Sequence, residues 1–306
     1  MWNHVLNSVR RLQTHALHTT GVRALQMGVA AVILYRVFTE LPFAGYFWGP
    51  DGVGKSDFTA RFGPHIGAAI NGLFAQSWGA YLVLVLMCAA GLALIAGRFT
   101  RAATVLALVT VWLLGMRNDM LADGGDNVIR IVLFYMLLFL PPGARVPERP
   151  SLRVWLHNIG VVAVIAQILV IYAVSGTSKV MGELWTNGTA MYYIAQVDWF
   201  STPYFRELFK NAWIAPLAAY ATIVYQIAFP FLALSRYRLP LFAIGIFFHL
   251  GIAVMMGLIT FSTIMIALEL FLIPNRDYLW MRQGAAQLWR RLQGRFPVLV
   301  RLGGAA

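Results

Sequence analysis

Residues 239–273 read LPLFAIGIFFHLGIAVMMGLITFSTIMIALELFLI, a stretch of 35 residues whose one charged side chain is Glu269. As one helix it would be about 52 Å long, whereas the hydrocarbon core of a bilayer is about 30 Å thick. The string Met256-Gly257-Leu258-Ile259-Thr260-Phe261-Ser262 supplies a place for a break. We therefore expect two membrane spans here, or one span followed by a re-entrant segment.

The rest of the chain has the same composition. Of its 306 residues 59% are hydrophobic and 12% are charged, whereas soluble domains have about 25% charged residues. This predicts an all-α, polytopic integral membrane bundle of about eight transmembrane helices. Their apolar runs are 25–43, 78–96, 102–116, 128–140, 155–174, 213–234, 239–257 and 258–273.

The basic residues predict the orientation of these spans. If alternate loops face the cytoplasm, they hold 16 of the 24 lysines and arginines, and the opposite face holds seven. Positively charged loops stay inside, so we expect both termini to be cytoplasmic. This describes a multi-pass protein of the cell (plasma or inner) membrane. Eight of the 12 acidic residues fall on the outer side.

Both ends of the chain are amphipathic. We divide the sequence into an N-terminal interfacial amphipathic helix, 1–21, a transmembrane domain, 22–273, and a basic amphipathic cytoplasmic tail, 274–306. Helices of this kind lie on an anionic inner leaflet; a partner-binding helix is the alternative. The lipid bilayer is thus the first expected partner.

Several function classes are excluded by pattern. Basic residues form no stripe with stacking aromatics, so we expect no nucleic acid partner. Residues 49–56, GPDGVGKS, match the nucleotide-binding Walker A string, but a phosphate loop follows a buried strand and this one follows a membrane span, so we expect a glycine-rich turn and no nucleotide. The single cysteine, Cys88, forms no disulfide within the chain. No cluster of cysteines and histidines has metal-ligand spacing, and we predict no metal.

Ionisable residues at membrane depth are the candidate site, because burying them is costly and by default marks function. Lys179 lies where an apolar run becomes polar on the predicted outer side. Arg36 and Glu40 are one helical turn apart and could pair within the first span. His249 is either a core histidine or a catalytic one. The segment 117–130 is either a solvated loop with local ion pairs or partly buried.

Four strings in order carry a family resemblance: YFWGPDGV at 46–53, NDMLADGGDNVIRIVLFYMLLF at 118–139, QILVIYAVSGTSKVMGELWTNGTAMYYIAQVDWFS at 167–201, and FFHLGIAVMMGLITFSTIMIA at 247–267. Over roughly residues 22–273 the chain resembles the HTTM domain, the membrane module of vitamin K-dependent γ-carboxylase. Bacterial relatives include SdpB-like proteins, which are associated with the maturation of peptide toxins.

The resemblance implies a reaction and a set of residues. Lys179 matches the lysine that deprotonates vitamin K hydroquinone in the carboxylase, and His249 matches a family histidine, so both are catalytic candidates. The implied cofactor is a quinol used with O2 and CO2, and Arg36, Asp126, Asn127, Tyr192 and Trp199 are its candidate contacts. In the carboxylase a functional histidine falls near the position of Asp126 and Asn127, and here no histidine does.

Three functions follow from these patterns. The first is a quinol-dependent, carboxylase-like membrane enzyme (a lyase or oxidoreductase) that acts on an exported peptide, with Lys179 as its base and an extracytoplasmic active face. The second is a non-catalytic membrane subunit for the maturation or export of a peptide toxin. The third is a transporter or proton pathway through Arg36, Glu40, Lys179, His249 and Glu269.

Overall fold

The computed structural model describes residues 12–54 and 56–295, and every regular element in these ranges is helical. The first half of the chain forms α2 (Thr19–Glu40), α3 (Ala44–Trp48), α4 (Thr59–Phe74), α5 (Gly79–Ala96), α6 (Thr100–Arg117) and α7 (Gly124–Met136). The second half forms α8 (Leu152–Val180), α9 (Glu183–Thr186), α10 (Ala190–Gln196), α11 (Pro203–Phe209), α12 (Ile214–Leu232), α13 (Arg238–Met256), α14 (Ile259–Phe271) and α15 (Asn275–Arg295).

Each of the eight apolar runs in the sequence falls on one of these helices. Within the described ranges six helices are long and apolar enough to cross a membrane, or seven if the bent pair of α14 and α15 counts as one span. The prediction of an all-helical chain with several helices long and apolar enough to span a membrane is therefore confirmed. Helices α7 and α14 have 13 residues each, which gives about 20 Å against a core of about 30 Å.

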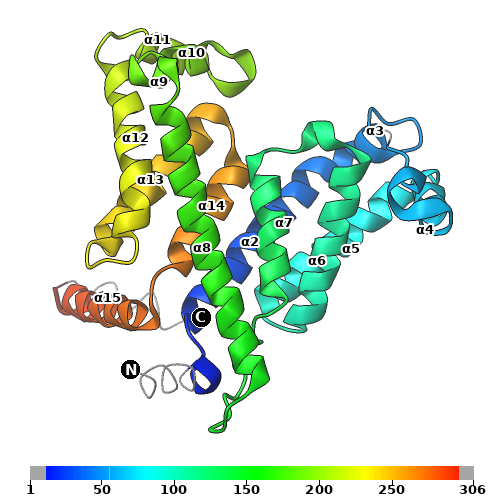
Figure 1. The fold of residues 1–306 in the computed structure, drawn as a ribbon, viewed down its shortest axis with the longest axis horizontal. Coiled ribbons are helices and arrows are strands. Elements are labelled where there is room, and N and C mark those ends of the chain that lie inside the picture. Colours follow the sequence, from blue (N-terminus) through cyan, green and yellow to red (C-terminus); the bar gives the residue numbers. More distant parts are fainter. Residues whose placement is uncertain (1–11, 55, 296–306) are drawn as a thin grey trace.

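Helix α2 lies at the centre of the bundle, between α5 and α14 (Figure 1). Gly21 and Gly28 on α2 face the backbone of Phe271 and the side chain of Ala267, and a Cβ at either glycine would overlap them. Small residues let two helices approach closely in a membrane, where packing drives association. The two glycines therefore account for the closeness of α2 and α14.

The break between α13 and α14 lies where the sequence predicts it. Helix α13 ends at Met256, and Gly257 has φ 68°, ψ 8°, the left-handed conformation in which glycine ends helices. Helix α14 begins at Ile259. Because the two helices pack against each other, this turn positions side chains of both on one buried site.

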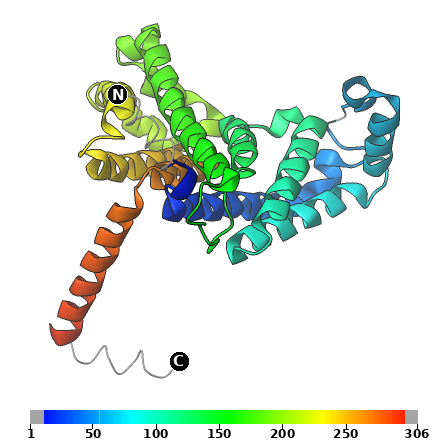
Figure 2. The same cartoon turned by 60° about the horizontal axis from the view of Figure 1, so that its bottom comes forward.

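At its end α14 turns by 97° into α15, which projects from the bundle (Figure 2). Residues 275–295, within the predicted tail, form a helix. Trp280 and Trp289 are 67% and 58% exposed beside Arg282 and Arg290. The predicted interfacial helix at 1–21 rests mainly on residues 1–11, which lie outside the described ranges. Residues 12–18 are fastened to α8, where the Asn158 side chain donates to the Leu12 and His15 carbonyl oxygens at 2.8 Å.

Candidate functional site

Four helices bring polar side chains together in the core. Tyr172 comes from α8, Tyr225 from α12, His249 from α13 and Glu269 from α14. Their exposed fractions are 1%, 8%, 1% and 0%. We call these four residues the Glu269 cluster.

The hydrogen bonds of the cluster converge on one carboxylate oxygen. Tyr225 Oη donates to Glu269 Oε1 at 2.8 Å, and Tyr172 Oη donates to the same oxygen. Tyr172 Oη also lies 2.7 Å from His249 Nε2, which is 3.6 Å from Glu269 Oε1. Since a tyrosine hydroxyl has one proton, a Tyr172 that donates to Glu269 accepts its other bond from a protonated Nε2.

Two atoms of the cluster have no hydrogen-bond partner among residues 12–54 and 56–295. They are His249 Nδ1 and Glu269 Oε2, and both are buried. The hydrogen-bonded chain from His249 through Tyr172 to Glu269 therefore has an open polar atom at each end. A buried polar atom without a partner is costly, so the unpartnered carboxylate oxygen of Glu269 points to a ligand or a proton.

Glycine and an aromatic side chain shape the space around the cluster. A Cβ at Gly245 would contact Tyr225 Oη and both carboxylate oxygens of Glu269, so α13 approaches the cluster only because residue 245 has no side chain. The Phe229 ring stacks on Tyr172 with centroids 3.7 Å apart. Apolar groups therefore surround the Glu269 cluster and keep its hydrogen bonds away from water.

The sequence singled out His249 and Glu269 but not the two tyrosines. Tyr172 and Tyr225 occur in apolar runs as QILVIY and TIVYQI, where aromatic residues are common. Their hydroxyl groups become informative only when α8, α12 and α14 are packed together. A buried tyrosine hydroxyl needs a hydrogen-bond partner. A tyrosine within an apolar run was therefore the available sequence signal for a buried polar contact.

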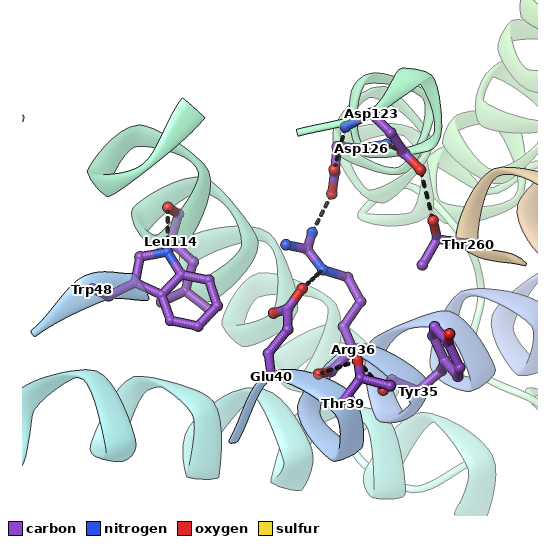
Figure 3. A network of polar contacts seen from close by, with 9 residues as sticks. All are labelled: Tyr35, Arg36, Thr39, Glu40, Trp48, Leu114, Asp123, Asp126 and Thr260. Atoms are coloured by element: carbon purple, nitrogen blue, oxygen red, sulfur yellow. Dashed lines mark hydrogen bonds and ion pairs between the residues drawn. The ribbon is translucent and has the colours of Figure 1, made fainter. Parts of the chain in front are cut away.

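A second polar cluster surrounds Arg36 (Figure 3). Arg36 Nε donates to Glu40 Oε1 at 2.9 Å, and Nη1 pairs with Asp126 Oδ1 on α7. Arg36 and Asp126 are 8% and 5% exposed. The predicted pairing of Arg36 with Glu40 is confirmed, and Asp126 gives the buried guanidinium a second carboxylate partner.

Asp126 is held in place by the start of its own helix. The Asp123 side chain accepts from the Asp126 amide at 3.1 Å, and the Asp126 side chain accepts from the Asp123 amide at 2.9 Å, which is a capping box. Thr260 Oγ1, near the start of α14, donates to Asp123 Oδ2 at 2.7 Å (Figure 3). A hydrogen bond therefore joins the starts of the short helices α7 and α14.

Phe261 lies between the two clusters. Its backbone faces Gly125, where a Cβ would come within 2.8 Å of the Phe261 Cα. Its ring centroid is 5.9 Å from that of His249. One residue of α14 thus separates the Arg36 cluster from the Glu269 cluster.

The segment 117–130 is partly buried, as the second of the two predictions for it stated. The exposed fractions of Arg117, Asn118 and Asp126 are 8%, 3% and 5%. The alternative of a solvated loop with local ion pairs is wrong, because in the described ranges no aspartate of the segment pairs with Arg117 or Arg130. Asp126 instead reaches across to α2.

Arg117 explains the string that resembles a Walker A motif. The string follows helix α3, not a strand. The Arg117 guanidinium donates to the carbonyl oxygens of Trp48, Gly49 and Ser56 at 3.3–3.4 Å. A phosphate loop presents amide N–H groups to its ligand, whereas this loop turns carbonyl groups toward an arginine.

Lys179 lies in the last turn of α8 and is half-buried. Its Nζ is 3.5 Å from the Ser175 carbonyl oxygen and 4.8 Å from the centroid of the Trp185 ring. Among the ion pairs of the described residues, none involves Lys179. Tyr172 and Lys179 are seven residues apart on one face of α8, which corresponds to about 10 Å along its axis.

The other residues predicted to contact a quinol do not lie on α8 with Lys179. Asn127 is exposed on α7 next to the buried Asp126. Tyr192 is on α10 and Trp199 follows it, with exposed fractions of 36% and 85%. The structure therefore brings Arg36 and Asp126 together. Tyr192 and Trp199 are exposed on the segment that joins α8 to α12, which carries the short helices α9, α10 and α11 (Figure 1).

Two of the acidic residues in that joining segment are paired locally. Asp198 pairs with Arg206, and Glu207 pairs with Lys210 at 2.5 Å. These pairs are solvent-exposed, so each contributes little to stability. They reduce the negative charge that the predicted outer face would present to a cationic peptide.

Metal ligands do not gather in the described part of the chain: no group of three or more His, Cys, Asp or Glu residues could hold an ion there. The Glu269 cluster combines one carboxylate, one imidazole and two phenols. This set can accept, hold and pass a proton.

Comparison with known proteins gives one relative. The chain is 29% identical over 194 residues to the uncharacterized protein YitO of Bacillus subtilis (strain 168). The match covers 58% of this chain and 62% of that protein, so it spans less than two thirds of the relative's length. No family model matches, and no solved structure shows a significant match.

Proposed function

We propose that this protein is a multi-pass cell-membrane enzyme of the HTTM type that moves protons during the oxidation of a membrane-soluble quinol. In this proposal the eight apolar helices are spans, both termini are cytoplasmic, and Lys179 faces the extracytoplasmic side. The distribution of basic residues supports this orientation. The 97° turn into the exposed, arginine-rich α15 supports a cytoplasmic interfacial tail.

The Glu269 cluster is the single observation that carries the proposal. A carboxylate with 0% exposure, beside a buried histidine, is expensive to keep in a membrane-embedded core. Hydrophobic residues would pack there at lower cost. Contributions from four helices to one hydrogen-bonded chain therefore support a catalytic or proton-handling role.

The chain's own residues supply the following steps. Lys179 Nζ, which has an aromatic ring beside it and no carboxylate partner among the residues that the structure describes, serves as the base that accepts a proton. His249 Nε2 passes a proton to Tyr172 Oη, and Tyr172 passes its own proton to Glu269 Oε1. Both transfers run along hydrogen bonds of the described cluster.

The donors and acceptors present fit a quinol in part. The Lys179 amine, which lies against the Trp185 ring and donates to the Ser175 carbonyl oxygen, suits the hydroxyl group of an aromatic diol. Lys179 does not line the apolar cavity of about 810 Å³ that lies against α4, α6 and α7. A bound quinol would supply an acidic hydroxyl and, with O2, oxidising power, and CO2 would supply the group added to a peptide.

The test uses the full chain in lipid nanodiscs. We expect quinol-dependent oxygen uptake in the wild type, and a loss of at least about hundredfold in Lys179→Ala, which is the usual contribution of a general base. Lys210→Ala removes an exposed lysine from the segment that joins α8 to α12 and should keep full uptake. Undiminished uptake in Lys179→Ala would exclude this mechanism.

An exported peptide is the proposed substrate, and the exposed Tyr193, Trp199 and Tyr204 support contact with it. Binding of a candidate peptide that persists in Lys179→Ala, with no modified product from the wild type, would instead favour the non-catalytic maturation subunit. Mass spectrometry of the peptide after incubation distinguishes the two.

A proton pathway is the second candidate, and the two open ends of the Glu269 cluster favour it. Protons could enter at one unpartnered atom and leave at the other. Proteoliposomes loaded with a pH-sensitive dye test this: proton flux that disappears in Glu269→Gln, without any quinol present, supports the pathway and argues against the enzyme.

A further inference from the structure

An apolar cavity of about 810 Å³ lies on the side of the bundle away from α12 and α13. Its walls come from α4, α6 and α7 and include Ile66, Trp112 and Phe134. Ile66 and Phe134 are each 61% exposed, so the cavity is a groove that opens to the surroundings. We call it the α4–α7 groove.

Arg130 is the charged residue in the lining of this groove. Its guanidinium carbon lies 5.6 Å from the centroid of the Trp112 ring. Its Nε is buried and has no hydrogen-bond partner within the described ranges. Room for the guanidinium is provided by Gly115, where a Cβ would contact Arg130 Nη2.

Arg36 and Arg117, the two buried arginines of the predicted outer half, have protein partners. Arg36 has two carboxylates, and Arg117 has three carbonyl oxygens. Asp126 is four residues before Arg130, which is the ordinary spacing for a helical ion pair, but it is bound to Arg36. Arg130 is therefore left without a protein counter-charge in the part of the chain that the structure describes.

The depth of Arg130 makes this costly. It is six residues beyond the start of α7 at Gly124, which corresponds to about 9 Å along the helix. A guanidinium at this depth in an apolar wall is strongly unfavourable unless an anion accompanies it. The missing counter-charge must then come from the surroundings of the groove.

We propose that the α4–α7 groove binds a membrane lipid whose anionic phosphate head group pairs with Arg130 and whose chains lie along α4 and α6. The planar guanidinium matches the two oxygens of a phosphate. The apolar walls of the groove match acyl chains, whereas free phosphate would make no favourable contact with them. This site is independent of the proposed enzyme reaction.

Photo-crosslinking in nanodiscs tests the site. Purified full-length protein is reconstituted with photoreactive phosphatidylglycerol or photoreactive phosphatidylcholine, and the labelled peptides are mapped. We expect phosphatidylglycerol to label peptides within residues 108–135 roughly tenfold more than phosphatidylcholine does, as one charge-assisted contact allows. Labelling of α15 is scored separately, because its arginines attract anionic lipids nonspecifically.

Arg130→Gln should lose the preference, and Arg61→Gln, at an exposed arginine of α4, should keep it. Arg130→Lys keeps the charge and should keep part of the preference. Equal labelling by the two lipids in the wild type, or an unchanged preference in well-folded Arg130→Gln, would overturn the proposal. Loss of the label on adding inorganic phosphate would also overturn it, because it would identify a phosphate site and not a lipid site.

The unfolding temperature of the protein gives a further test of the lipid site. A lipid that binds the folded state raises its thermal stability. The unfolding temperature should therefore be higher in phosphatidylglycerol nanodiscs than in phosphatidylcholine nanodiscs, and Arg130→Gln should narrow that difference while Arg61→Gln should not. The same unfolding temperature for wild-type protein in both lipids would contradict the proposal.

Discussion

Replacing the two tyrosines of the Glu269 cluster by phenylalanine should have unequal effects. Tyr172→Phe removes two hydrogen bonds, one to Glu269 and one with His249, whereas Tyr225→Phe removes one. Hydrogen bonds between helices in a membrane are worth about 0.6 kcal/mol on average and up to about 1.7, and bonds to a charged group lie at the upper end. We expect the free energy of unfolding to fall by about 2 kcal/mol in Tyr172→Phe and by about 1 kcal/mol in Tyr225→Phe.

The double variant should be worse than the sum of the single ones. Each single variant leaves Glu269 Oε1 with one donor, whereas the double variant leaves both carboxylate oxygens without a partner, since Oε2 already has none among the described residues. An unsatisfied buried group costs about 1–3 kcal/mol. The coupling free energy should therefore be about 1 kcal/mol or more.

Detergent-induced unfolding in bicelles gives these free energies, with Tyr46→Phe as the matched control. Tyr46 is 65% exposed, so its variant should be close to the wild type. The reasoning fails if Tyr225→Phe costs as much as Tyr172→Phe. It also fails if the two effects add to within about 0.5 kcal/mol, which is the usual limit for independent sites.

Three further outcomes are expected. Asp126→Asn should lower the free energy of unfolding by about 2 kcal/mol or more, because it takes one of two carboxylates from the buried Arg36; exposed Asp119→Asn should not, and equal effects on the unfolding temperature would count against the pair. Hydrogen bonds from the Thr59 hydroxyl, then the Thr59 amide and Asn71, hold the pKa of Asp57 below its ordinary value. Their stabilisation is therefore present above the ordinary pKa of about 4 and is lost as the pH falls through the lower folded-state value; nuclear magnetic resonance titration should find a higher Asp57 pKa in Thr59→Val, and an unchanged one would refute this cause. In a Cys88→Ser background, Asp51→Cys should react with an impermeant thiol reagent added outside intact cells and Arg145→Cys should not, and the reverse would overturn the proposed orientation.

The positions of the main helices could be predicted because they follow from local composition. Each apolar run became a helix, the glycine at 257 ended α13, and the spacing of Arg36 and Glu40 gave their pair. These features depend on residues that are close in the sequence.

What could not be predicted depends on contacts between distant helices. Tyr172 and Glu269 are 97 residues apart and Arg36 and Asp126 are 90 apart, so no periodicity joins them. The i, i+4 rule alone would pair Asp126 with Arg130, but Asp126 pairs with Arg36 on α2 instead. Helix α4 was also missed, because Gly63, with φ 77°, and Pro64 interrupt it.

The pairing of Arg36 has a consequence for biosynthesis. At about 5–20 residues per second, the ribosome makes Asp126 some 5–18 seconds after Arg36. If α2 enters the bilayer during that interval, Glu40, four residues away, is the partner that accompanies the Arg36 guanidinium. Glu40 therefore matters most to the nascent chain, and its loss should appear first as inefficient insertion at the translocon.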